Sequence, residues 1–164
     1  MSETDQGAGA APAHVTPLVE VHRRLGAKLV EFGGWLMPIQ YAGILEEHRA
    51  VRERAGLFDL SHMGELYVEG PEAARALAHA LVTDPGALAV GRAHYSMICA
   101  PDGGILDDLI VYRLGEERFL VVPNAGNARR VSDAVAERIG AFKAVLDDRS
   151  LATALCAVQG PRAA

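Results

Sequence analysis

The segment PDGGILDDLIVYR, residues 101–113, decides the fold that we expect around it. Gly103 and Gly104 suit a tight turn, because glycine readily adopts positive φ angles. The bulky, β-branched and aromatic residues that follow predict a strand. Since successive side chains of a strand point to opposite faces, we expect one of Asp107 and Asp108 to face solvent and the other to face the core or a cleft. A carboxylate on the buried side needs a partner, which favours a ligand that carries hydrogen-bond donors or develops positive charge.

The segments around this hairpin alternate between helix-like and strand-like patterns. Thr16 and Pro17 are typical of a helix start, as N-cap and first helical residue, and Asn124 is placed to cap the last helix. We expect helices over 16–26, 45–55, 71–82 and 126–139, and strands over 28–32, 64–69, 93–100, 106–114, 118–122, 143–146 and 154–158. In the middle of the chain this order predicts an α+β fold, with helices packed on a largely antiparallel sheet.

The composition of the 164-residue chain excludes several classes of function. Its net charge of −5 argues against a nucleic-acid surface, which normally shows a basic patch. Its apolar stretches are shorter than the roughly 18–20 residues that span a bilayer, and its N-terminus lacks the pattern of a signal peptide. Cys99 and Cys156 have no metal-type spacing and indicate two reduced thiols, and the histidines show no ligand spacing. We therefore predict a cytoplasmic protein with no metal site.

Several further motifs accompany the hairpin in a fixed order. They are TPLVEVHRRLGAKLVEFGGWLMPIQY (16–41), EEHRAVRERAGLFDLSHMGEL (46–66), AHYSMICAPDGGILDDLIVYRL (93–114), VVPNAGN (121–127) and AVQGP (157–161). Together they resemble the aminomethyltransferase family of the glycine cleavage system, the T-protein, over almost the whole chain. The family usually continues for at least as much again, so the resemblance implies that this chain is the front part of a longer polypeptide.

The resemblance implies a domain organisation and a reaction. The fold would be three domains arranged as a cloverleaf around tetrahydrofolate. Residues 1–15 would form a disordered tail, 16–60 the start of the first folate-binding domain, 61–148 the sheet domain, and 149–164 a return to the first domain. The reaction would take an aminomethyl group from the lipoyl arm of H-protein to give methylenetetrahydrofolate and ammonia.

The resemblance also implies the residues of a folate site. Asp108 would lie against the reactive folate nitrogens. It would thus be the aspartate that faces inward, toward a cavity that holds the folate, and Asp107 would face away from it. We expect Asp108 to accept a hydrogen bond from the folate and to stabilise positive charge on the transferred carbon. Tyr95 and Tyr112 would stack on the ligand, unless both are only packed sheet residues. Met63 would line the pocket or belong to the core. Asn124 would bind folate, cap the helix, or do both.

Two other interpretations compete with the transferase. The chain would be a non-catalytic folate-binding module if it belonged to the related iron–sulfur assembly or amine-oxidising families. It would be inactive if it were only a truncated fragment. The nearby His62 is interpreted as a structural histidine with its hydrogen bonds satisfied, rather than as a catalytic base.

Overall fold

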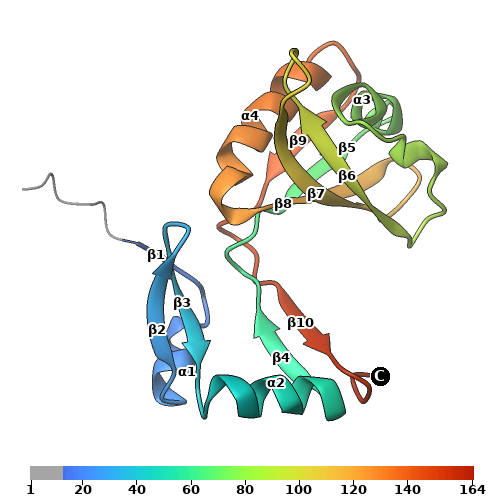
Figure 1. Ribbon diagram of the computed structural model, residues 1–164. Helices are drawn as coiled ribbons and strands as arrows, with labels where there is room; N and C mark the ends of the chain where they lie inside the picture. Colours follow the sequence, from blue (N-terminus) through green and yellow to red (C-terminus); the bar gives the residue numbers. More distant parts are fainter. Residues whose placement is uncertain (1–12) are drawn as a thin grey trace, which may run out of the picture.

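The computed structural model describes residues 13–164, which form two lobes joined by two connections (Figure 1). The two connections, 60–65 and 149–155, run beside each other and are hydrogen-bonded at Leu60 and Leu155. Residues 1–12 of the expected tail lie outside the described part. For the last residues of that tail the expectation is wrong, because His14 and Val15 pair with Trp35 and Leu36.

The N-terminal lobe combines small sheets with two helices. Its elements are β1 (His14–Val15), α1 (Val19–Arg24), β2 (Lys28–Phe32), β3 (Trp35–Gln40), α2 (Ile44–Glu53), β4 (Gly56–Asp59) and, from the chain end, β10 (Cys156–Gln159). One sheet has the order β1-β3-β2, and β10 pairs antiparallel with β4. The last strand therefore returns to the lobe in which the chain begins.

The sheet lobe contains the hairpin with the two aspartates. Its elements are β5 (Leu66–Glu69), α3 (Ala73–Ala80), η1 (Pro85–Ala87), β6 (Ala93–Cys99), β7 (Ile105–Arg113), β8 (Arg118–Pro123), η2 (Ala125–Asn127), α4 (Ala128–Ile139) and β9 (Val145–Asp148). The five strands have the order β6-β7-β8-β5-β9, and every neighbouring pair is antiparallel. The predicted α+β class is confirmed.

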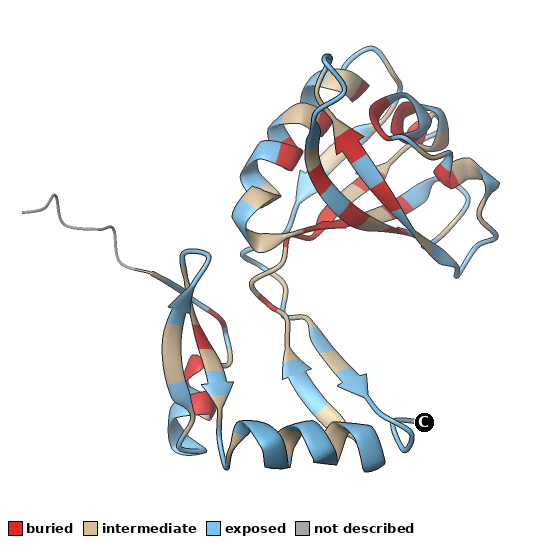
Figure 2. Cartoon of the chain, viewed as in Figure 1, coloured by how far each residue is buried: buried red, intermediate tan, exposed pale blue. Residues whose placement is uncertain are grey.

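The core lies between one face of this sheet and the helices α3 and α4. Strand residues such as Val68, Val111 and Phe119 are fully buried there, against Leu77 of α3 and Val135 of α4. Figure 2 shows that burial is concentrated in the sheet lobe, whereas the N-terminal lobe is mostly exposed. Because the helices cover only one face, the other face of the β6–β7 hairpin carries exposed side chains.

The start of the first helix differs from the sequence-based expectation. The N-cap position of α1 is Leu18, which makes no side-chain capping bond, and the helix begins at Val19. Thr16 is buried, and its hydroxyl donates a hydrogen bond to Asp59 instead, 2.6 Å away. A long-range partner in the tertiary structure has replaced the local cap that the sequence favoured.

Candidate functional site

The two adjacent aspartates of β7 point to opposite faces of the sheet, but not in the expected sense. Asp107 is only 4% exposed and shares the helix-covered face with Leu109 and Val111. Asp108 is exposed on the other face. The expectation that Asp108 points into a core or cleft is therefore wrong for this chain. The alternation itself holds, because strand geometry forces the two carboxylates apart.

Asp107 is held by three hydrogen bonds at the beginning of η2. Its Oδ2 accepts from the backbone N–H of Asn124 at 2.9 Å. Its Oδ1 accepts from the side-chain amides of Asn124 at 3.0 Å and Asn127 at 2.7 Å. A buried carboxylate without a cation needs such donors to replace lost water. Asp107 is thus an ordered structural group, rather than the free surface aspartate that the sequence suggested.

Asp108 shares its face with both of the predicted tyrosines. Asp108 lies directly opposite Met97 in the β6–β7 pairing, and Tyr95 lies opposite Ile110. Ile110 and Tyr112, two and four positions after Asp108 in the strand, point to the same face as Asp108. Tyr95 is 73% exposed and Tyr112 is 38% exposed, so neither is a packed core residue. The hairpin gathers one carboxylate and two aromatic rings on an open sheet surface.

Asn124 joins the two aspartates and does not cap a helix with its side chain. It is the residue before η2, and no side-chain capping bond is formed there. Its side-chain nitrogen also contacts the Asp108 carbonyl oxygen at 2.8 Å and the Asp108 carboxylate Oδ1 at 3.2 Å. The capping role predicted for Asn124 is wrong: its side-chain nitrogen donates to Asp107 and Asp108, and its side-chain oxygen accepts no capping N–H.

Met63 lies in the first connection between the lobes and is half-buried. The next residue, Gly64, donates its backbone N–H to the Pro123 carbonyl at 3.1 Å. An added Cβ at Gly64 would lie 2.7 Å from a Pro123 side-chain carbon, so only glycine allows this approach. The approach brings the Met63 segment beside the end of β8, where Asn124 lies.

Sequence reasoning missed several residues around the aspartates. Asp107 and Asn127 were not identified as a hydrogen-bonded pair, and Met97 was not identified as the cross-strand neighbour of Asp108. The alternation gave no signal for the covered face, because Asp107 alternates with Leu109 and Val111 while Asp108 alternates with the equally apolar Ile110 and Tyr112. The donor from Asn127 had no local signal, because it depends on how β8 and η2 meet β7.

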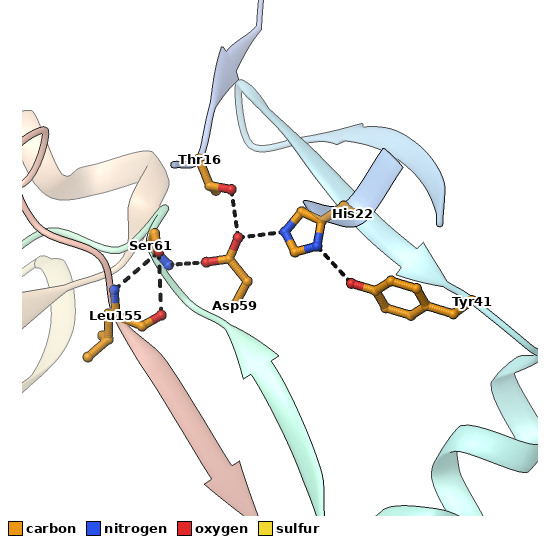
Figure 3. A network of polar contacts seen from close by, with 6 residues as sticks. All are labelled: Thr16, His22, Tyr41, Asp59, Ser61 and Leu155. Atoms are coloured by element: carbon orange, nitrogen blue, oxygen red, sulfur yellow. Dashed lines mark hydrogen bonds and ion pairs between the residues drawn. The ribbon is translucent and has the colours of Figure 1, made fainter. Parts of the chain in front are cut away.

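A second polar cluster lies in the N-terminal lobe around Asp59 (Figure 3). The Asp59 Oδ2 accepts from the Thr16 hydroxyl and contacts His22 Nε2 at 2.8 Å, while His22 Nδ1 contacts the Tyr41 hydroxyl at 2.8 Å. The other oxygen accepts from the Ser61 backbone N–H at 2.9 Å. Burial alone would raise the pKa of Asp59, but hydrogen bonds from Ser61, Thr16 and His22 outweigh it and lower that pKa.

Two buried polar groups near the lobe junction have no hydrogen-bond partner among the described residues. Glu65 is 1% exposed and both of its carboxylate oxygens are unpaired. Burial, followed by the nearby Asp148 charge, raises the pKa of Glu65 to about 7. His62 Nδ1 is also buried and unpaired, and burial lowers the His62 pKa. The expectation of a fully satisfied His62 is therefore wrong.

Two clefts lie in the N-terminal lobe, and Asp108 lines neither of them. One, of about 510 Å³, is bounded by β3, α2 and β4. The other, of about 260 Å³, lies beside α1 and includes His22, Tyr41 and Cys156. Within residues 13–164, no group of three or more His, Cys, Asp or Glu side chains is arranged to hold a metal ion. No helix in that range has the length and apolar character needed to cross a membrane.

The family of the chain follows from its match to known sequences. A family model described as the GCVT N-terminal domain matches residues 18–164. The chain belongs to this family. Its motifs were interpreted as those of the glycine cleavage T-protein, and that resemblance is confirmed by the relatives and by the structural neighbour.

The similar proteins are longer than this chain. An aminomethyltransferase of Saccharopolyspora erythraea is 57% identical over 148 residues, which cover 90% of this chain and 40% of that protein. One from Streptomyces avermitilis is 58% identical over 151 residues, with 92% and 40% covered. The crystal structure of glycine cleavage system aminomethyltransferase T from Bartonella henselae superposes with a TM-score of 0.83 at 43% identity, covering 91% of this chain and 41% of that one. The chain thus spans about two fifths of each relative.

Proposed function

We propose that this chain provides the folate-facing sheet of a tetrahydrofolate-dependent aminomethyltransferase of the glycine cleavage system. The reaction transfers an aminomethyl group from the lipoyl arm of H-protein and yields methylenetetrahydrofolate and ammonia. The names of the relatives support the activity. One observation supports the site: the Asp108 carboxylate stands on an exposed sheet face beside Met97, and Tyr95 and Tyr112 share that face.

Asp108 is the proposed catalytic group, because the transferred carbon becomes electron-poor and iminium-like. A carboxylate about 4 Å from that carbon attracts it by roughly 1 kcal/mol in bulk water, but by about 4 kcal/mol at an effective dielectric near 20. The larger value corresponds to about three powers of ten in rate. Since Asp108 is exposed in this chain, the larger value requires the bound folate and the surrounding protein to displace water.

The remaining predicted residues would bind the ligand. Tyr95 and Tyr112 offer aromatic faces on which a pterin or aminobenzoyl ring stacks. Asn124 is already bonded to Asp108, so a ligand that reaches one side chain reaches the other. Met63 lies on the segment that adjoins the end of β8 and would supply an apolar contact. Each of these groups holds tetrahydrofolate against Asp108 and leaves the chemistry to the carboxylate.

The proposal includes a partner and a cellular location. The donor of the aminomethyl group is lipoylated H-protein, which brings its arm to the same sheet face. The location is the cytoplasm, where reduced thiols persist, and both Cys99 and Cys156 are free. Both the partner and the location depend on the proposed reaction and would be withdrawn if that reaction were disproved.

Turnover tests the role of Asp108. The assay uses a hybrid in which this chain replaces the equivalent part of the Saccharopolyspora erythraea aminomethyltransferase, over the 148 aligned residues. Asp108→Asn should keep the fold and lower kcat more than tenfold at saturating tetrahydrofolate. Asp102→Asn is the matched control, because Asp102 is an exposed turn residue of the same hairpin that bonds only Gly104. Near-normal turnover of Asp108→Asn would contradict the catalytic role.

Calorimetry of the hybrid with tetrahydrofolate separates the competing functions. Folate binding together with turnover supports the transferase. Folate binding by a well-folded hybrid that lacks turnover with lipoylated H-protein supports a non-catalytic folate-binding module. The absence of both, in a hybrid with a cooperative melting transition, contradicts the proposal.

A further inference from the structure

We infer that Asp107 is a positioning residue, which acts through Asn124 to hold the Asp108 carboxylate in its reactive orientation. The inference rests on the proposed function, because it assigns a task to a neighbour of the proposed catalytic group. Asp107 itself cannot touch a ligand on the open sheet face, since it is 4% exposed and lies on the opposite face. Any effect of Asp107 on the reaction must therefore pass through another residue.

Asn124 is the residue that reaches both faces. Its backbone N–H and its side-chain nitrogen donate to the two oxygens of Asp107, which fixes the Asn124 backbone and side chain together. The same side-chain nitrogen lies within hydrogen-bond distance of the Asp108 carbonyl and of the Asp108 Oδ1. An amide NH₂ group has two hydrogens, so one serves Asp107 and the other serves Asp108.

The Asp107 carboxylate is one of three acceptors that fix which way the Asn124 amide points. All three groups around the amide nitrogen are acceptors: the Asp107 carboxylate, the Asp108 carboxylate and the Asp108 carbonyl. Rotating the amide by half a turn would put its oxygen against those acceptors and lose every bond. A neutral Asn at position 107 would present a donor in one orientation and remove this constraint. The amide would then no longer hold the Asp108 carboxylate in one place.

A second donor shows that Asp107 itself is held in place. Asn127 Nδ2 donates to the Asp107 Oδ1 at 2.7 Å, from within η2. Asp107 is therefore rigid enough to orient a neighbour, and the Asn127 bond can be removed without touching Asn124. That bond provides the control for a purely structural role.

The kinetic test uses the aminomethyltransferase hybrid and variants of positions 107, 124 and 127. Asp107→Asn should lower kcat about tenfold, while the tetrahydrofolate Kd changes less than threefold. Asn124→Ala should lower kcat by a similar factor. The double variant should lose no more than the worse single variant, because both changes break one connection to Asp108. Asn127→Ala should lower kcat less than threefold, although it removes a hydrogen bond from the same Asp107 oxygen.

A spectroscopic test uses the 164-residue chain and does not depend on turnover. The two side-chain amide protons of Asn124 should exchange slowly with solvent in the unaltered chain, because both are hydrogen-bonded. Asp107→Asn should shift the signal of the proton that faces Asp107 and speed its exchange at least tenfold, whereas Asn127→Ala should leave both signals near their original positions. If Asp107→Asn does not fold, Asp107→Ser takes its place, since its hydroxyl keeps one acceptor.

The outcomes distinguish failure of this inference from failure of the proposed function. If the hybrid shows no turnover, the proposed function is contradicted. The Asn124 amide signals then still show whether Asp107 orients that side chain. Independent, multiplying losses in Asp107→Asn and Asn124→Ala would overturn the inference. So would equal losses in Asp107→Asn and Asn127→Ala, because they would show that Asp107 acts only through stability.

Discussion

A buried carboxylate lies at each end of the first connection between the lobes. One of them has several hydrogen-bond partners and the other has none among the described residues. Asp59, at the end of β4, receives hydrogen bonds from Thr16, His22 and Ser61. Glu65, at the start of β5, has no partner for either oxygen among residues 13–164. The comparison shows that burial alone does not decide in which direction the pKa of a carboxylate shifts. The direction depends on how many hydrogen-bond donors replace the water that the carboxylate has lost.

The two groups therefore give stability opposite dependences on pH. Asp59 has a lowered pKa in the folded state, so its contribution is present above the ordinary value of 3.8 and is lost as the pH falls through the lower folded value. Glu65 has a raised pKa, so the fold carries no penalty below about 4.5 and loses stability as the pH rises toward 7. The Asp59 end of the connection is therefore more stable at neutral pH, and the Glu65 end is more stable in acid.

Removing the satisfied carboxylate should have the largest effect. Asp59→Ala leaves the Thr16 hydroxyl, His22 Nε2 and the Ser61 N–H without their acceptor, and we expect a cost of about 3–5 kcal/mol in the free energy of unfolding. Urea unfolding measures the loss, and amide hydrogen exchange should show it in β1–β4 before the five-stranded sheet. Asp102→Ala, in an exposed turn, is the control and should cost less than about 1 kcal/mol. Equal costs for the two variants would contradict the importance of the Asp59 cluster.

Replacing Glu65 by a neutral side chain should mainly change how the free energy of unfolding depends on pH. It should change the highest stability that the chain reaches by less. Between pH 5 and pH 8 the unaltered chain should lose about 2–3 kcal/mol through Glu65, because its pKa rises from 4.5 to about 7 on folding. Glu65→Gln should abolish this slope, as measured by urea unfolding at several pH values. Glu69→Gln is the control, since Glu69 ends β5, the strand that directly follows Glu65, but pairs with Arg118 at the surface. A slope that survives in Glu65→Gln would place the titrating group elsewhere.

A smaller change sharpens the comparison within the Asp59 cluster. Thr16→Val keeps the shape of a buried side chain and removes one donor, leaving the bonds from His22 and Ser61 in place. We expect a cost of about 1–2 kcal/mol, the usual loss when one buried hydrogen-bond partner is removed. The same urea titration measures it, with Thr153→Val as the exposed control. A cost as large as that of Asp59→Ala would mean that one bond carries the whole cluster.

Much of the sheet lobe was predictable from local pattern. The turn at Gly103 and Gly104, the strand that follows it and the alanine-rich helix before β6 were all expected near their observed positions. These segments carry strong signals, because turn glycines and apolar periodicity act over a few residues. Thr16 shows the limit of such reasoning, since its preferred local role as a cap gave way to a partner 43 positions away.

The sequence predicted that the two aspartates of the candidate site lie on opposite faces, but not which face each one takes. Alternation correctly separated Asp107 from Asp108 and grouped Asp108 with Tyr112. It did not say which face the helices α3 and α4 would cover. The prediction assumed that the important carboxylate must be the buried one, whereas the covered face holds Asp107 and the open face holds Asp108. The two faces of a strand have different neighbours in the fold and therefore different environments. The sequence of the strand itself does not indicate which face has which environment.

The amino-acid sequence by itself determined the family of this chain, its α+β class and the set of side chains that share a strand face, because these depend on residue order and on the two-residue period of a strand. Only the tertiary structure decided the partners of Asp59, the lack of partners for Glu65 and the bridge from Asp107 through Asn124 to Asp108. Each of these depends on donors brought together from distant parts of the chain. Hydrogen bonds act over about 3 Å, so a donor counts only when the fold places it there.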